Sequence, residues 1–337
     1  MGWYIHKDFG GQLMTTYPLL LKPAVKDYLW GGTRLKTEFG YEGGGIAAEA
    51  WALSCHKDGP SVIQNGALAG KTLHDAISLW GESAIGEKAA GFPYFPILIK
   101  LIDARDRLSV QVHPDNEYAL RVEGEFGKTE LWYVVDCQPG ARLIYGMNRS
   151  LDKEEFRRRI GDGTLPDVVN SVPVKKGDVF FIEAGTLHAI GAGILIAEVQ
   201  QNSNTTYRVS DYGRIGADGK PRELHVDKAV DVTVTAPPSL PYGDTGETAD
   251  VAGGASRMLA QCEFFSTGLL SVSCSMEVGK EDSFCSLVCL EGGCTLIAED
   301  CRPLHLHKGS SVFLPADIKA RLMGNPESPA QILYSYL

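Results

Sequence analysis

The chain has 337 residues, which exceeds what one hydrophobic core usually serves, so two domains are the starting expectation. Hydrophobic residues make up 44% of it, and 38 glycines and 17 prolines separate short apolar runs, a composition typical of strands and tight turns. The formal net charge of -10 argues against a nucleic acid or an anionic membrane as partner. A small anionic substrate remains compatible with this charge where cations gather locally.

The start of the chain has no feature of an exported or membrane-bound protein. Residues 1–17 are Gly-rich and mixed, without the apolar core of a signal peptide, and we expect them to be mobile. No apolar run in the sequence approaches the ~20 residues of a membrane span. We therefore expect a cytoplasmic protein, and the sequence leaves its oligomeric state open.

Strands and short helices alternate through the first two thirds of the chain. Apolar runs predict strands, which are at 18–24, 48–54, 97–102, 108–112, 129–135, 142–145, 179–182 and 193–199. Apolar residues at helical spacing and charged stretches predict helices, which are at 72–85, 115–123 and 150–160. Thr72 is placed to cap the first of these helices.

A Pro- and Gly-rich stretch divides the chain into two expected domains. This stretch, residues 241–255, is typical of a linker between packed units. It would separate a catalytic domain at 18–240, with its helical insertions, from a C-terminal domain at 256–337 that is almost wholly strand and turn.

A short internal repeat supports two similar units. Residues 177–185 and 309–317 both have a glycine turn, an apolar strand and a second turn. This pattern resembles the second conserved motif of cupins, which delivers a metal-binding His. The aligned positions hold His188 in the first copy and Ala320 in the second. We therefore expect a mainly β fold of two cupin-type jelly-roll barrels, the first with a metal and the second metal-free.

The sharpest chemical signal lies around Gln111 and His113. On a strand these two side chains project to the same face, and Glu130 and His188 can supply a carboxylate and a fourth ligand. One Gln, one Glu and two His form a nitrogen and oxygen set suited to Zn²⁺, with room for water or substrate oxygens. A strand His alone is more often a packed side chain, but here it does not stand alone.

These motifs resemble the type I mannose-6-phosphate isomerases in their shorter bacterial form. The matching segments run in family order between residues 18 and 230, and include Trp30–Gly32, Ala48–Ser54, Gln111–Pro114, Gly127–Glu130, Ala184–Ala189 and Glu198–Val209. The resemblance implies one zinc ion per chain, held by Gln111, His113, Glu130 and His188. It also implies a substrate cleft lined by the cations of Lys100, Lys128 and Arg208.

The activity implied by the resemblance is the reversible conversion of mannose 6-phosphate to fructose 6-phosphate through a cis-enediol. We take Lys100 as the first candidate for the base, because burial and a nearby zinc ion both favour a neutral amine. Arg208 would hold the phosphate or assist ring opening, and the sequence does not separate these tasks. Trp30, Ser109 and Tyr207 are further candidates for substrate contact.

Other interpretations compete with this one. A non-catalytic sugar-binding or regulatory bicupin would have the same fold, and an iron-dependent cupin oxygenase would use a related ligand set. Six of the eight cysteines lie between Cys262 and Cys301, but their spacing is not that of a zinc ribbon, and we interpret them as buried apolar side chains. His305 and His307 share a strand face and are expected at the surface.

Overall fold

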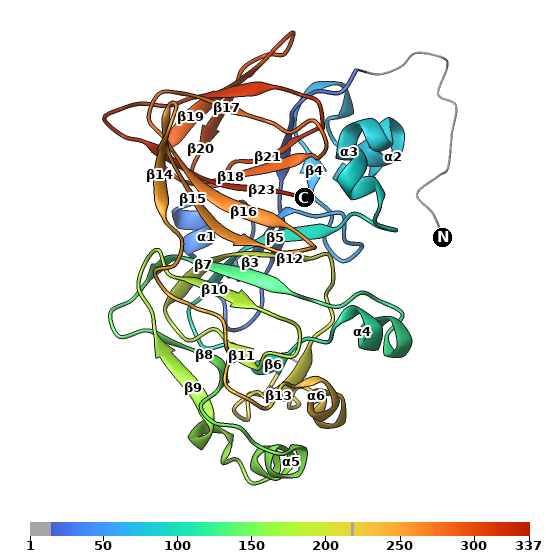
Figure 1. Ribbon diagram of the computed structural model, residues 1–337, viewed down its shortest axis with the longest axis vertical. Coiled ribbons are helices and arrows are strands. Elements are labelled where there is room, and N and C mark those ends of the chain that lie inside the picture. Colours follow the sequence, from blue (N-terminus) through green and yellow to red (C-terminus); the bar gives the residue numbers. More distant parts are fainter. Residues whose placement is uncertain (1–14, 217–218) are drawn as a thin grey trace.

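The structure is a computed structural model that describes residues 15–216 and 219–337 (Figure 1). Most of the segment expected to be mobile, 1–17, therefore lies outside the described residues. Within them, antiparallel strands dominate and helices are few and short, which confirms the predicted mainly β class.

The strands that precede residue 240 are β1 (Leu19–Lys22), β2 (Ala24–Lys26), β3 (Glu49–Leu53), β4 (Val62–Ile63), β5 (Ile97–Ala104), β6 (Val110–Val112), β7 (Glu130–Cys137), β8 (Arg142–Met147), β9 (Val169–Pro173), β10 (Val179–Ile182), β11 (His188–Ala189), β12 (Ile194–Gln201) and β13 (Tyr207–Ser210). The later strands are β14 (Thr248–Val251), β15 (Gly254–Gln261), β16 (Ser266–Val272), β17 (Ser275–Val278), β18 (Cys285–Glu291), β19 (Gly293–Ala298), β20 (Leu304–His307), β21 (Ser311–Leu314), β22 (Ala320–Met323) and β23 (Ala330–Tyr336).

The helices are α1 (Arg34–Thr37), α2 (Leu73–Trp80), α3 (Glu82–Ala90), α4 (Asn116–Val122), α5 (Lys153–Gly161) and α6 (Val226–Val232). The helix expected over 72–85 is two helices, because Gly81 between them has a φ of 65° that ends the first. Thr72 caps α2 as expected, in a reciprocal box with Asp75. No helix among the described residues is long and apolar enough to cross a membrane.

The N-terminal barrel consists of two antiparallel sheets. One has the strand order β10-β7-β12-β5-β3-β2, and the other the order β13-β6-β11-β8-β9. Large apolar side chains from both sheets, such as Trp132 and Tyr145, form one buried cluster between them. The strands β5 and β12 are buried along their whole length, because the second barrel covers their other face.

The C-terminal barrel includes two strands from the start of the chain. Its larger sheet has the order β14-β15-β16-β23-β18-β21-β1-β4, and its smaller sheet has the order β17-β22-β19-β20. The strands β1 and β4 therefore belong to this sheet, although they come from the range expected to form the catalytic domain. The expected linker 241–255 contains β14 and the first residues of β15.

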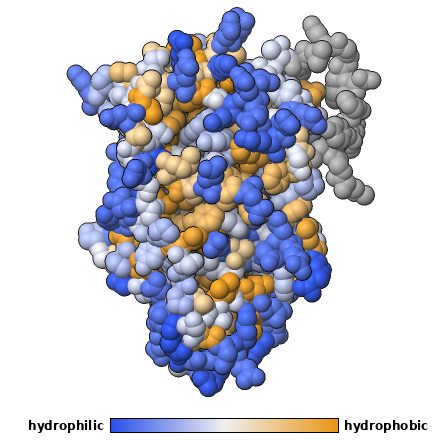
Figure 2. All heavy atoms as spheres, in the orientation of Figure 1, coloured by the Kyte–Doolittle hydropathy of each residue, from blue (hydrophilic) through white to orange (hydrophobic). Residues whose placement is uncertain are grey.

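A shared apolar core joins the two barrels. The ring of Phe284 lies 4.9 Å from that of Phe95 and 5.4 Å from that of Phe313, measured between centroids. The Ser311 hydroxyl donates a hydrogen bond of 2.8 Å to the Ala52 carbonyl across the same junction. In Figure 1 the C-terminal strands β16 and β23 accordingly lie beside β5 and β12, and the surface seen in Figure 2 is largely hydrophilic with small apolar patches.

Candidate metal centre

Neighbouring strands bring the four predicted ligands together. The strand β11 pairs with β6 so that His188 lies opposite Gln111, and His113 follows the last residue of β6. Glu130 begins β7, on the facing sheet. The N-terminal barrel therefore collects the four side chains from both of its sheets.

The ligand atoms lie within a few ångströms of one another. Glu130 Oε2 lies 3.6 Å from His113 Nε2, and Glu130 Oε1 lies 3.4 Å from His188 Nε2. The side-chain amide of Gln111 lies 3.3 Å from His188 Nε2. His113, Glu130 and His188 are buried, and among the described residues they form a group that could hold a metal ion.

Backbone carbonyls fix the tautomer of both histidines. His113 Nδ1 donates to the Thr205 carbonyl at 2.9 Å, and His188 Nδ1 donates to the Thr186 carbonyl at 2.8 Å. In each ring Nδ1 carries the proton, so Nε2, the nitrogen that lies near Glu130, carries the lone pair. This is the arrangement in which a neutral imidazole binds a metal.

Burial sets the charge state of the same groups. It lowers the pKa of His113 well below its ordinary value and that of His188 to about 4, so both rings are neutral near pH 7. Burial also raises the pKa of Glu130 to about 7, with the neighbouring Glu198 carboxylate as the next cause. A divalent cation beside Glu130 would favour its ionised form.

The cluster fits a metal of the size and preference of zinc. Tetrahedral bonds of roughly 2.1 Å separate two ligand atoms by about 3.4 Å, close to the distances from Glu130 to the two histidines. Both oxygens of Glu130 are buried and lack a hydrogen bond of acceptable geometry, although Oε2 lies 2.7 Å from Lys128 Nζ. A carboxylate in this condition is a ready metal ligand.

Lys128 reaches the cluster because Gly127 precedes it. A side chain at position 127 would come within 2.4 Å of the Asp115 carbonyl carbon, so only glycine allows the chain to pass here. The Lys128 amide then donates to the Pro114 carbonyl at 3.0 Å. The Lys128 ammonium donates to His113 Nε2 at 3.1 Å, which places a cation at the edge of the cluster.

A cavity of about 290 Å³ opens beside the ligands. It is lined by Tyr28, Trp30, Glu49, Lys100, Ile102, Leu108, Ser109, Gln111, Lys128, Ile190, Glu198, Asn204, Thr206, Arg208 and Arg222. Most of the residues predicted to contact substrate are therefore at its wall, among them Lys100, Lys128 and Arg208.

Lys100 lies between two carboxylates that the sequence argument gave no role. Its ammonium lies 3.3 Å from Glu198 Oε1 and 3.8 Å from Glu49 Oε2. Burial acts to lower the pKa of Lys100, but the Glu49 and Glu198 carboxylates outweigh it and raise the pKa above its ordinary value. These two carboxylates therefore do not favour the neutral amine that we expected from burial and a nearby zinc ion. The sequence did not show that strand pairing places Glu198 opposite Lys100.

Tyr207 does not lie in the cavity. Its ring is buried in a separate apolar cluster, and its hydroxyl donates to Glu123 Oε1 at 2.8 Å. Tyr207 and Arg208 are consecutive on β13, so they project to opposite faces, and only Arg208 reaches the cavity. The expectation that Tyr207 contacts substrate is not supported by this position.

Arg222 is a cavity residue that the sequence argument missed. It makes two hydrogen bonds to the buried Asp211 carboxylate, at 2.8 Å and 2.5 Å. No sequence pattern near Arg222 indicates a place in the cavity, because the residue lies in a polar loop. Glu198 had a readable signal, because it is an acidic residue within the fully buried strand β12, as Lys100 is within β5.

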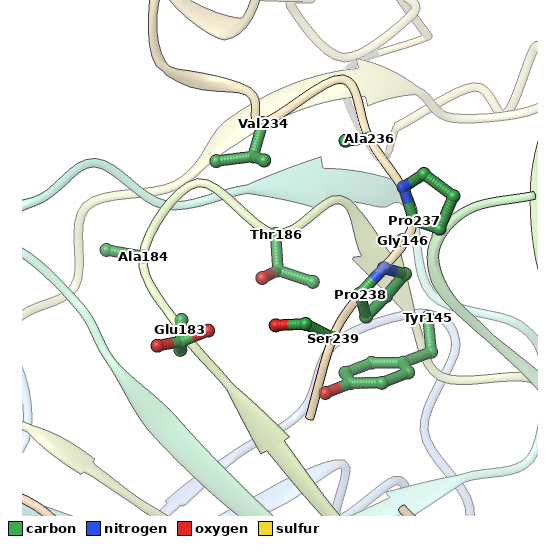
Figure 3. A pocket seen from close by; sticks show the side chains of 10 residues that line it. All are labelled: Tyr145, Gly146, Glu183, Ala184, Thr186, Val234, Ala236, Pro237, Pro238 and Ser239. Carbon is green, nitrogen blue, oxygen red and sulfur yellow. The ribbon is translucent and has the colours of Figure 1, made fainter. Parts of the chain in front are cut away.

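A second cavity, of about 260 Å³, is lined in part by Glu183, Ala184 and Thr186, in the loop that precedes β11 (Figure 3). Its wall includes Tyr145, Glu183, Thr186 and Pro238, and the Thr186 carbonyl is the acceptor for His188 Nδ1. None of the residues predicted as metal ligands or substrate contacts lines it. The candidate site is therefore the first cavity, where the ligands and cations converge.

Fold and site define a bicupin protein whose N-terminal barrel contains a His-Glu-His group that could hold a metal ion. Residues 19–128 match the family model for the phosphomannose isomerase type I catalytic domain, and residues 255–323 match that for the mannose-6-phosphate isomerase cupin domain. The chain belongs to the type I phosphomannose isomerases, which are aldose-ketose isomerases.

Individual relatives agree with this family. The mannose-6-phosphate isomerase ManA of Bacillus subtilis is 41% identical over 305 residues, which are 90% of this chain and 94% of that protein. The mannose-6-phosphate isomerase of Streptococcus mutans is 38% identical over 304 residues, again 90% of this chain and 94% of the relative. The crystal structure of the Bacillus subtilis enzyme superposes with a TM-score of 0.85 and 36% identity, covering 96% of this chain and all of that one.

Proposed function

We propose that the protein interconverts mannose 6-phosphate and fructose 6-phosphate. The observation that carries this proposal is the concentration of cations around the metal cluster in a chain of net charge -10. Lys100, Lys128, Arg208 and Arg222 all line one cavity. A sugar phosphate dianion needs such a local field to enter an acidic protein.

We propose zinc as the metal, with one ion per chain. Gln111, His113, Glu130 and His188 would hold it, and the nitrogen and oxygen donor set favours zinc over a purely oxygen-binding ion such as magnesium. When bound, it would supply Lewis acidity that stabilises negative charge on a substrate oxygen. An iron-dependent oxygenase is the less suitable alternative, because a neutral Gln gives iron little support.

The protein groups that would move the proton lie at the centre of the cavity. Isomerisation removes the proton from C2 of the open-chain sugar, passes through a cis-enediol, and returns a proton to C1. Glu198 Oε1 is buried, has no hydrogen bond of acceptable geometry and lies 3.3 Å from Lys100 Nζ. We propose that Lys100 and Glu198 act as a pair, with the carboxylate accepting the proton and the ammonium stabilising the developing charge.

Arg208 and Arg222 are the candidates for holding the phosphate. Arg208 Nη1 donates to the Glu223 carbonyl at 2.9 Å, while its Nε is buried without a partner. Burial lowers the pKa of Arg208, with the Arg222 guanidinium as the next cause, so an anion between the two would relieve their repulsion. Trp30 and Ser109 would complete the wall toward the sugar ring.

The cysteines support the proposed cytoplasmic location. All eight are free thiols, and several lie in the core of the C-terminal barrel. Reduced cysteines persist in the reducing cytosol, whereas secreted proteins tend to pair them.

A coupled assay tests the proposed activity. Fructose 6-phosphate formed from mannose 6-phosphate is measured before and after treatment with a chelator, and after zinc is returned. We expect activity that the chelator abolishes and zinc restores. Sugar binding without turnover in the zinc-loaded protein would favour the non-catalytic sugar-binding or regulatory bicupin.

A further inference from the structure

A partly buried chain of contacts leads from the predicted metal ligand His113 to a carboxylate outside the cavity. His113 Nδ1 donates to the Thr205 carbonyl at 2.9 Å, and the Thr205 hydroxyl donates to Glu125 Oε2 at 2.7 Å. The other oxygen, Glu125 Oε1, lies 3.3 Å from His56 Nε2. One carboxylate therefore joins three loops that come from distant parts of the chain.

His56 holds Glu125 from the far side in a defined orientation. The Asp58 amide donates to His56 Nδ1 at 3.1 Å, so His56 carries its proton on Nε2 and donates it to Glu125. The His56 side chain is only 5% exposed and packs edge-on against the ring of Trp51. Hydrogen bonding from His56 lowers the pKa of Glu125, which keeps the carboxylate ionised.

Thr205 has few other restraints on its position. It lies in the loop between β12 and β13, where its amide donates to the Ser203 hydroxyl at 3.2 Å. The next residue toward the N-terminus, Asn204, donates to Asp58 at 3.0 Å. The contact with Glu125 is shorter than either of these, and it comes from the loop that follows α4 rather than from the Thr205 loop itself.

We propose that Glu125 is a positioning residue of the metal centre, which holds Thr205 so that its carbonyl keeps the His113 ring aimed at the other ligands. The inference rests on the proposed metal site. Residues that orient a ligating histidine typically change metal affinity or activity by about 10- to 100-fold when they are removed. Glu125 acts through Thr205 and does not touch the substrate cavity.

The test measures the dissociation constant of Zn²⁺, without sugar, by competition with a chromogenic chelator. We expect Glu125→Ala and Thr205→Val each to weaken zinc binding by about 10-fold or more. Thr205→Ser should bind zinc as the wild type does, because it keeps the hydroxyl that contacts Glu125. The double variant should bind zinc about as tightly as the weaker-binding of the two single variants, because both changes break the same contact. The absorption spectrum of the Co²⁺-loaded protein should shift in the two weakened variants.

Glu117→Ala on α4 is the matched control, since Glu117 is an acidic residue of the adjacent helix that is not part of the contact chain, and it should bind zinc as the wild type does. Wild-type affinity in both Glu125→Ala and Thr205→Val would overturn the role of Glu125. If Glu125→Ala fails to fold by circular dichroism, the comparison of Thr205→Val with Thr205→Ser decides the question. A wild-type protein that binds no zinc would overturn the metal site and this role together.

Discussion

The ammonium of Lys100 lies 3.3 Å from Glu198 Oε1, and the two residues face each other across the paired strands β5 and β12. Each changes the protonation of the other. Burial acts to raise the pKa of Glu198, but Lys128 and Lys100 outweigh it and lower the pKa below its ordinary value. The pair is therefore ionised near pH 7, which is the state that the proposed role of the Glu198 carboxylate as proton acceptor requires.

The first prediction concerns this pair. Glu198→Gln removes the proton acceptor and Lys100→Met removes its cationic partner, so each should lower kcat by more than ~100-fold, the usual scale for a positioned acid-base group. Lys71→Met, at an exposed lysine, serves as the control. Steady-state kinetics with mannose 6-phosphate measures the effect, and near-normal kcat in Glu198→Gln would reject the carboxylate as the base.

The second prediction concerns the metal ligands. His188→Ala removes one of the two imidazoles that face Glu130, so zinc content and turnover should fall together while the β-rich circular dichroism spectrum persists. His305→Ala, at a histidine of the other barrel, should leave both unchanged. Full turnover by a metal-free His188→Ala protein would show that these residues do not form the working centre.

The third prediction concerns the pH dependence of metal binding. Glu130 has its pKa raised to about 7, whereas that of His188 is lowered to about 4 and that of His113 is also far below its ordinary value. Between roughly pH 5.5 and 7, therefore, only Glu130 must release a proton when the metal binds. Zinc affinity should rise about 10-fold per pH unit up to pH 7 and then level off. Chelator competition between pH 5.5 and 8 would show a flat profile if Glu130 were not a ligand.

The fourth prediction separates binding from chemistry. Arg208→Lys and Arg222→Lys replace a two-pronged guanidinium by a single ammonium, so KM for the sugar phosphate should rise much more than kcat falls. Competitive inhibition by inorganic phosphate should weaken in the same variants. Arg142→Lys, on β8, is the control. A fall in kcat at constant KM in Arg208→Lys would instead assign that residue to ring opening.

The sequence predicted the parts of the fold that depend on local patterns. Apolar runs located β5, β6, β7, β10 and β12 closely, and the turn-strand-turn repeat indicated two barrels. It did not show that β1 and β4 join the sheet of the C-terminal barrel, because antiparallel pairing between Leu19 and Phe313 leaves no trace in local spacing. Because strands from the start of the chain complete the C-terminal barrel, local sequence patterns do not define the domain limits, and the limits at 241–255 remain a prediction.

In the candidate site, too, the sequence predicted what depends on local patterns and missed what depends on tertiary contacts. Gln111 and His113 were readable because two positions on one strand share a face, and Lys100 because a charge in an apolar run is costly. Tyr207 was misplaced because the face of β13 that reaches the cavity depends on its neighbour β6. Arg222 was missed because its place at the cavity depends on Asp211, a tertiary contact.

The last prediction concerns the C-terminal barrel, which we expect to be metal-free. Ala320 begins β22 as His188 begins β11, so the repeat offers no imidazole at that place. Burial raises the pKa of Cys285 and Cys289 to about 12, and a protonated thiol is a poor metal ligand. Cys285 Sγ instead lies 3.1 Å from the Tyr334 hydroxyl. Elemental analysis should therefore give about one zinc per chain in the wild type and in Cys285→Ser alike. Two zinc ions per chain, with one lost in Cys285→Ser, would place a second metal in this barrel.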